Sequence, residues 1–313
     1  MTNRFKSPAD WQQDVDQSVH DYDDWYLAES PGMFAEAREQ AVIDVEEAMN
    51  ATDNLRAFGV DSLVARPGML FVARMCISPP MARDRFVSLS GVSKSLVTKM
   101  ERHGVIPAGA RRLGVQLEVM CDFLLPLLDP QLFCWLVESR APRTTELHKA
   151  LLIVGERLAN ARYLTVLRNA QEARQKELLR AYLEGEGFEE SRYPPFEMPS
   201  GTFGFGRNVG VVRDDGERQN LPVDCVVSPF NAERPLVCVE LKSAGDYTNP
   251  NKRRKEESDK HVALKRTHGD GVVFLLQLFG YFNPPYLGFE ASAGIDWAWD
   301  HRLGDFAMYF GIE

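Results

Sequence analysis

Several features that would assign a chain of 313 residues to a common class are missing from this one. Its five cysteines form an odd, scattered set without a C-x-x-C pair: Cys76, Cys121, Cys134, Cys225 and Cys238. That pattern argues against a disulfide framework and against a zinc site, and it is typical of a reducing compartment, so we expect a cytoplasmic protein. Cys225 and Cys238 stand in apolar stretches, where we expect small buried side chains.

No stretch is apolar enough to cross a membrane. The most apolar run, 123–137, is interrupted by Pro126, Asp129 and Pro130. The first 24 residues are polar and acidic, so we expect no signal peptide. Motifs of the types G-x-S-x-G, P-loop and H-E-x-x-H are also missing, which leaves serine hydrolases, P-loop ATPases and zinc proteases without support.

The charge is distributed unevenly. The chain has a net charge of −9, which at first disfavours a partner such as DNA. Residues 1–60 hold 13 Asp and Glu against 4 Lys and Arg, whereas the remainder holds 32 of each kind. The whole acidic excess therefore lies in the first sixty residues, and a basic cleft elsewhere is compatible with the composition.

The remaining patterns predict an α/β protein in two parts. Residues 1–158 are expected to be mainly helical, and residues 159–313 to form an α/β domain. A long helix is predicted from about 159 to 184, ending at Gly185 and Gly187. Val- and Leu-rich segments predict strands at 202–212, 221–227, 235–242 and 272–278, with a charged helix at 250–266. The predicted order is helix, strand, strand, strand, helix, strand.

Three residues on two of these strands point to hydrolysis of a phosphodiester. Asp224 lies on one strand, and Glu240 and Lys242 lie on the next. Residues i and i+2 of a strand face the same way, so the three side chains can converge. Two carboxylates with few other ligands suit Mg²⁺, which keeps several waters and takes phosphate oxygens, and the ammonium can orient or deprotonate a water. The alternative is a strand end that happens to read E-L-K.

This order of elements, with the acids on the second and third strands, resembles the core of the PD-(D/E)xK nuclease superfamily. The stretches ELKSAGDYTNPNKRRKEESDKHVALK and GYFNPPYLGFEASAGIDWAWDHR resemble the XamI-type restriction endonucleases over most of residues 160–305. The proline stands two residues before Asp224 rather than next to it, which departs from the superfamily motif.

The resemblance implies a type II restriction endonuclease with a mixed sheet. Asp224 and Glu240 would hold Mg²⁺, and Lys242 would be the lysine of the motif. The enzyme would cut both strands of a short palindromic DNA site, such as GTCGAC, and leave 5′-phosphates. A two-fold homodimer would match the symmetry of such a site, and a cognate DNA methyltransferase would protect the host.

An acid on the preceding helix is a further candidate for the catalytic site. Glu177 and Glu184 are seven residues apart and share a helix face. We favour Glu177, because E-x-L followed by L and G-F resembles that helix in related nucleases. A solvated acid on an amphipathic helix is the alternative.

Two segments are candidates for DNA contact. The charged helix follows the acid–acid–lysine motif and holds 7 Lys and Arg against 3 Asp and Glu, although such a run is often just a solvated face. Residues 83–102 resemble a helix-turn-helix with its turn at Gly91, and an ordinary helical hairpin is the alternative. The predicted DNA-contacting residues are Ser93, Lys94, Ser95, Thr98, Lys99, Arg102, Asn249, Asn251, Lys252, Arg253 and Arg254.

Two readings compete with the restriction endonuclease. A repair or structure-specific nuclease could share the same core, and a helix-turn-helix regulator could bind DNA without cutting it. In the C-terminal tail, the cluster from Asp296 to Arg302 is expected mainly to pack over the sheet, with His301 and Arg302 as lesser candidates for phosphate or base contact.

Overall fold

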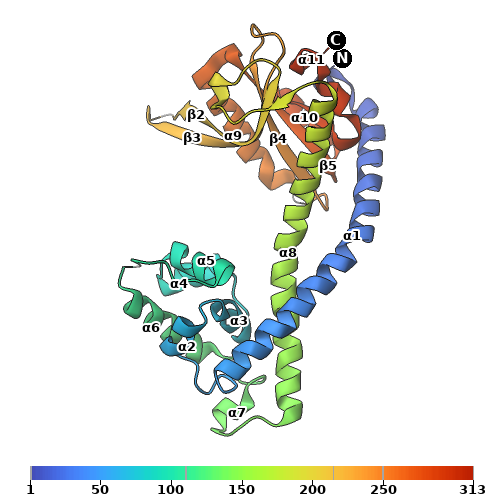
Figure 1. The fold of residues 1–313 in the computed structure, drawn as a ribbon. Coiled ribbons are helices and arrows are strands. Elements are labelled where there is room, and N and C mark those ends of the chain that lie inside the picture. The colour runs from blue at the N-terminus through green and yellow to red at the C-terminus, as the bar shows by residue number, and fades with distance from the viewer. Residues whose placement is uncertain (1, 110, 214, 249, 313) are drawn as a thin grey trace. The chain divides into compact units, whose positions relative to one another are not determined.

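The chain folds into two compact units (Figure 1). This computed structural model describes residues 2–109, 111–213, 215–248 and 250–312, with the backbone alone for 250–254. One unit is Ser30–Leu167, and the other combines Met1–Glu29 with Arg168–Glu313. The sequence-based division into 1–158 and 159–313 did not anticipate that the N-terminal residues belong with the C-terminal unit.

Two long helices run through both units. α1 spans Pro8–Ala51 and continues through Pro31, although proline removes one backbone hydrogen bond there. α8 spans Thr144–Gly185 and so begins well before the predicted start near residue 159. In the part of the chain that the structure describes, no helix is long and apolar enough to cross a membrane.

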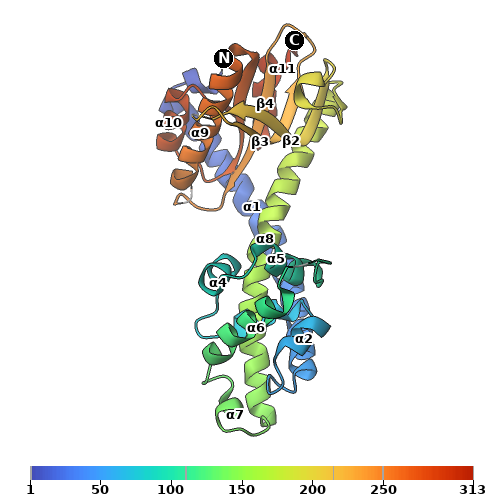
Figure 2. The same ribbon diagram turned by 90° about the vertical axis from the view of Figure 1, so that its left-hand side faces the viewer.

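The unit Ser30–Leu167 is helical, as the sequence predicts. Besides parts of α1 and α8 it contains α2 (Val60–Ala65), α3 (Met69–Cys76), α4 (Arg83–Ser90), α5 (Lys94–His103), α6 (Leu113–Leu124), α7 (Cys134–Val137) and the 3-10 helix η2 (Leu125–Leu127). α4 packs against α5 and α6 (Figure 2). Gly91 ends α4 in the left-handed conformation, with a φ of 71°, and the Ser93 hydroxyl accepts the Leu96 N–H at the start of α5.

A buried ion-pair network fixes this helical pair to its neighbours. The side chain of Glu101 on α5 is fully buried and binds the guanidinium groups of Arg74 on α3 and Arg83 on α4. The Arg83 Nε donates to Glu101 Oε2 over 2.7 Å. The network therefore ties three helices together through one carboxylate.

We expect Glu101→Gln to lower the free energy of unfolding by about 3–5 kcal/mol, because it leaves the buried Arg74 guanidinium without a counterion. Urea unfolding followed by circular dichroism measures the change. Glu47→Gln is the matched control, since Glu47 pairs with Arg66 on the surface, and it should cost about 1 kcal/mol or less. Equal losses in the two variants would contradict this account.

The second unit is built on a six-stranded mixed sheet in the order β1-β2-β3-β4-β5-β6. Its strands are β1 (Glu189–Glu190), β2 (Thr202–Val212), β3 (Arg218–Ser228), β4 (Leu236–Ala244), β5 (Val272–Gly280) and β6 (Asp296–Trp299). β2, β3 and β4 pair antiparallel, whereas β1 with β2, β4 with β5 and β5 with β6 pair parallel. The four predicted strands are present, and the short β1 and β6 were not predicted.

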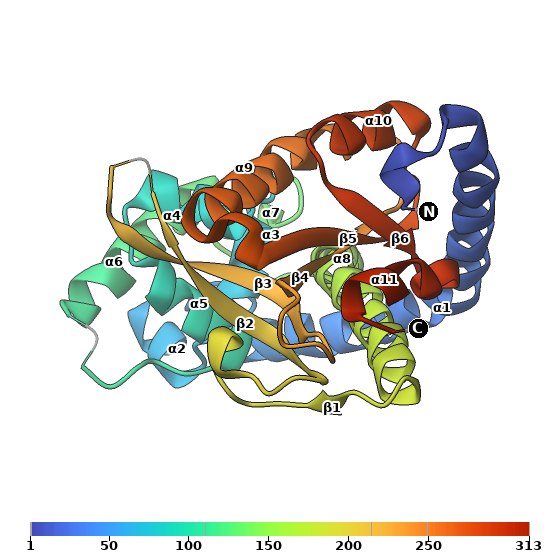
Figure 3. The ribbon, with the colours of Figure 1, turned by 90° about the horizontal axis from the view of Figure 1, so that it is seen from above.

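Helices cover both faces of this sheet (Figure 3). α9 (Pro250–His268), α10 (Pro284–Ser292) and the start of α1 pack on one face, where the buried residues include Trp11, Leu264 and Tyr286. The C-terminal part of α8 and α11 (Ala307–Phe310) pack on the other, around Leu179 and Phe310. Because side chains alternate along a strand, β4 sends Val239 and Leu241 toward α8 and Cys238 toward α9. The described residues of this unit also form the 3-10 helices η1 (Asn3–Phe5), η3 (Pro195–Glu197), η4 (Gly269–Gly271) and η5 (Asp300–Phe306).

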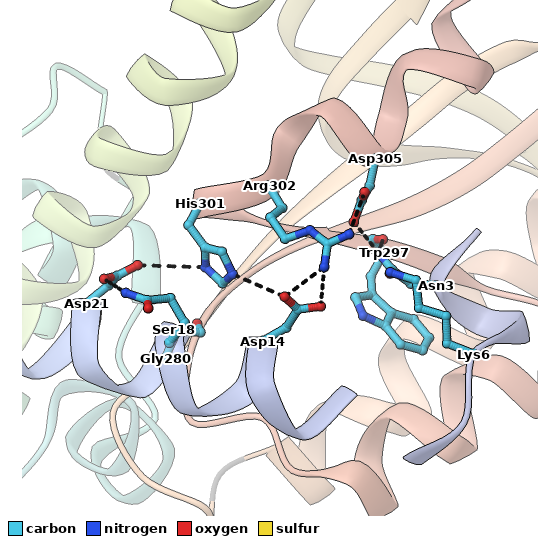
Figure 4. Close-up of polar contacts among 11 residues, drawn as sticks. Asn3, Lys6, Asp14, Ser18, Asp21, Gly280, Trp297, His301, Arg302 and Asp305 are labelled. Atoms are coloured by element: carbon cyan, nitrogen blue, oxygen red, sulfur yellow. Dashed lines mark hydrogen bonds and ion pairs between the residues drawn. The ribbon is translucent and has the colours of Figure 1, made fainter. Parts of the chain in front are cut away.

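Acidic residues of α1 hold the chain's N-terminal segment against η5 (Figure 4). Arg302 donates to both oxygens of Asp14, at 2.8 and 2.7 Å. His301 lies between Asp14 and Asp21, 3.6 and 3.7 Å from their oxygens. Asp296 accepts from the Arg4 N–H at 2.9 Å. Part of the N-terminal acidic excess therefore serves to dock this segment, and the cluster around Arg302 contributes to packing.

Candidate active site

The candidate site lies where β3 and β4 separate. Their ladder pairs Cys225 with Val239 and continues away from the acids to the pair Val227 and Val237. Beyond Cys225 the Asp224 carboxylate takes over as acceptor, and its Oδ2 receives the Leu241 N–H at 2.9 Å. The Asp224 side chain thus takes the place of a backbone carbonyl of β3 as the acceptor for Leu241. The two strands separate here, and the carboxylate lies at the point of separation.

The structure brings Glu240 and Lys242 to the same place as Asp224. Glu240 is only 4% exposed, on the α9 side of β4. The Lys242 Nζ lies 3.1 Å from Glu240 Oε1, as expected for residues i and i+2 of one strand. Glu240 and Lys242 therefore meet as predicted, and the charges of both act on Asp224.

α9 adds two residues that the sequence did not single out. Lys260 donates to Glu240 Oε1 and, over 3.1 Å, to the carbonyl oxygen of Pro222. Glu257 is buried, lies 3.9 Å from the Lys242 Nζ and accepts the Tyr286 hydroxyl at 2.7 Å. Glu257, Lys260 and the buried Leu264 recur at helical spacing, which is the signal that could have placed them on the sheet-facing side.

The electrostatics of the site suit a divalent cation. Burial, and then the charge of Glu240, raise the pKa of Asp224 above its ordinary value. Glu240 Oε2 is buried and has no hydrogen-bond partner among the described residues, so a ligand position is left over. In the described ranges no three His, Cys, Asp or Glu side chains are grouped to share a metal ion. Two carboxylates fit an ion that completes its shell with water and phosphate oxygens.

We expect the affinity for Mn²⁺ to rise with pH above about pH 4, the ordinary pKa of an aspartate. The raised pKa means that the folded, cation-free protein retains the Asp224 proton above the ordinary range, and a cation must displace that proton. Calorimetric titration without DNA at several pH values measures the trend. An affinity that does not change over this range would contradict the assignment of Asp224 as a ligand.

Glu177 is not part of this cluster. Its side chain is 76% exposed and lies 3.7 Å from Arg180, and Glu184 is also near Arg180, at 3.9 Å. The polar positions of α8 that face the sheet are instead Gln171 and Gln175, six and two residues before Glu177 in the chain. Gln175 donates to the carbonyl oxygen of Lys242 at 3.3 Å. α8 therefore directs the amide side chains of Gln171 and Gln175 toward the sheet. Glu177 points away, because a step of two residues along a helix rotates the side chain by more than half a turn about the helix axis.

The predicted DNA-contacting residues on α5 are mostly at the surface. Ser93, Lys94, Ser95, Lys99 and Arg102 are exposed, and Thr98 is half-buried. Lys94 pairs with Asp84 at 3.0 Å. Asn249 lies outside the described residues, as do the side chains of Asn251, Lys252, Arg253 and Arg254.

Comparisons with known proteins agree with the family that the sequence resembles. The model of the XamI restriction endonuclease family matches residues 53–299. Type II restriction enzyme SalI of Streptomyces albus G is 39% identical over 315 residues, which cover 97% of this chain and 98% of that protein. No solved structure gave a significant match. The chain therefore belongs to the XamI restriction endonuclease family, and it is a type II restriction endonuclease.

Proposed function

We propose that this endonuclease uses Mg²⁺ and a catalytic core of the PD-(D/E)xK type. The observation that carries the proposal is the opening between β3 and β4, where Asp224 and Glu240 lie beside Lys242. Both acids are held by backbone or lysine contacts, and Glu240 Oε2 remains available for a ligand. Such a pair fits an ion that prefers one or two carboxylates together with phosphate oxygens.

Each residue of the site has a distinct role in this proposal. Asp224 and Glu240 would hold the ion, which would supply stabilisation of the negative charge on the scissile phosphate and activation of a water. Lys242 orients the attacking water through its ammonium. Glu257 keeps that ammonium in place from the α9 side, 3.9 Å away, and its own carboxylate is fixed by Tyr286. The products would be a 5′-phosphate and a 3′-hydroxyl.

DNA recognition in this proposal combines the two units. Lys99 and Arg102 on α5 are exposed and basic, as expected for a helix of a helix-turn-helix that meets the major groove. The basic residues 252–255 follow the acid–acid–lysine motif in the sequence and would neutralise backbone phosphates. A homodimer would cut both strands of a palindrome, GTCGAC by the family resemblance, and a cognate methyltransferase would protect the host's own sites.

Digestion of a long, unmethylated duplex DNA with Mg²⁺ and with EDTA tests this function. Discrete fragments are expected with Mg²⁺ alone, and sequencing their ends gives the site and the cut position. A smear would indicate a nuclease without a fixed site. Intact DNA that is shifted in a binding gel would indicate a DNA-binding protein that does not cut.

A further inference from the structure

Lys260 occupies an unusual position at the candidate site. It comes from α9, yet its ammonium reaches both strands at the point where they separate. It donates to the Pro222 carbonyl on β3 and to the Glu240 carboxylate on β4. A lysine on a solvated helix face would not be expected to contact two strands where they separate. Lys265, on the same helix, pairs instead with the exposed Asp270.

The two lysines at Glu240 are held differently. Lys242 has a second carboxylate beside it, because Glu257 lies 3.9 Å from its Nζ. Lys260 has only Glu240 and a neutral carbonyl oxygen as partners among the described residues. If Glu240 binds a cation, Lys242 keeps Glu257 as a nearby counterion. The two carboxylates near Lys260, Glu240 and Asp224, would both be occupied by that cation.

The formal charges of the five side chains at the site also indicate a role for Lys260. Asp224, Glu240 and Glu257 with Lys242 and Lys260 carry a net charge of −1, which a divalent cation changes to +1. That value matches the single negative charge of a phosphodiester, and without Lys260 it would be zero. Lysine is a compact charge on a flexible four-carbon chain, so its ammonium can turn from Glu240 to a neighbouring anion.

We propose that Lys260 is a second catalytic lysine, which neutralises Glu240 in the cation-free protein and contacts the scissile phosphate once a cation occupies that carboxylate. This inference rests on the proposed function, since it requires Glu240 to be a metal ligand. In this proposal Lys260 stabilises the negative charge of the transition state, whereas Lys242 orients the attacking water.

Lys260→Met tests the proposal through two readouts. Without DNA, the variant should bind Mn²⁺ on the order of tenfold more tightly, because no ammonium competes for Glu240. Its single-turnover rate of DNA cleavage with saturating Mg²⁺ should fall on the order of 10²-fold. Lys260→Gln keeps a hydrogen-bond donor without the charge and should behave in the same way, which guards against a folding defect of the first variant. Lys265→Met is the matched control on the same helix and should change neither value.

An unchanged cleavage rate in both Lys260 variants would overturn the proposal. A weakened affinity for Mn²⁺ in both variants would also overturn it, because Lys260 would then be a structural support of the site. Mn²⁺ binding by the wild-type protein and by Glu240→Gln distinguishes a failure of the Lys260 proposal from a failure of the proposed function. If it binds Mn²⁺ and Glu240→Gln does not, the metal site stands whatever the Lys260 variants do. If wild type and Glu240→Gln bind Mn²⁺ equally, the metal site itself is wrong.

Discussion

Replacing Asp224 by Asn or Glu240 by Gln is expected to slow DNA cleavage at least about 10³-fold, because the site then loses several kcal/mol of charge stabilisation. Both substitutions keep the shape of the side chain, and the amide oxygen of Asp224→Asn would still accept the Leu241 N–H. Binding to duplex DNA in EDTA should be at least as tight as for the wild type, since a negative charge beside the phosphate is removed. Single-turnover cleavage and a gel-shift titration measure the two effects.

Glu177→Gln is the matched control for these variants. It removes an acid of the same type from the exposed face of α8, where the nearest cation is Arg180. We expect its cleavage rate to stay close to that of the wild type. If Glu177→Gln lost as much activity as Glu240→Gln, the third acid of the site would have to be sought on α8 after all.

Lys242→Met is expected to reduce the single-turnover rate by roughly 10²–10⁴-fold, the range typical of a group that positions or moves a proton. Mn²⁺ should still bind, because both carboxylates remain, and this result separates the loss of the lysine from the loss of the metal site. Lys176→Met is the control, since Lys176 pairs with Glu172 on the outer side of α8. A Lys242→Met variant that cut DNA at nearly the wild-type rate would contradict the role assigned to this lysine.

In the unit that contains Asp224, Glu240 and Lys242, helices and strands could be predicted from the sequence where the hydrophobic periodicity is clear and turn residues mark the ends. β2 occupies 202–212, the predicted range. The short β6, Asp296–Trp299, was missed because four residues give too little alternation to stand out among the aromatic residues around them. The acid–acid–lysine set could be found because residues i and i+2 of one strand face the same way, whatever the rest of the fold does.

Features that depend on distant contacts could not be predicted in the same way. Lys260 and Glu257 belong to a helix whose many charges look like a solvated face in sequence, and only their packing against β4 distinguishes them. The rotation of α8 about its axis decides that Gln175 rather than Glu177 meets the sheet. The docking of Asp14 on Arg302 joins residues 288 positions apart, so the acidic N-terminal stretch offered no sign of its partner.

Anomalous diffraction from crystals grown with Mn²⁺ would show directly whether Asp224 and Glu240 hold the ion. We expect one Mn²⁺ bound by carboxylate oxygens of both Asp224 and Glu240, with the Lys260 ammonium displaced from Glu240. A peak on other residues, or a site in which Asp224 still accepts from Leu241 and Glu240 still binds both lysines without any ion, would contradict it.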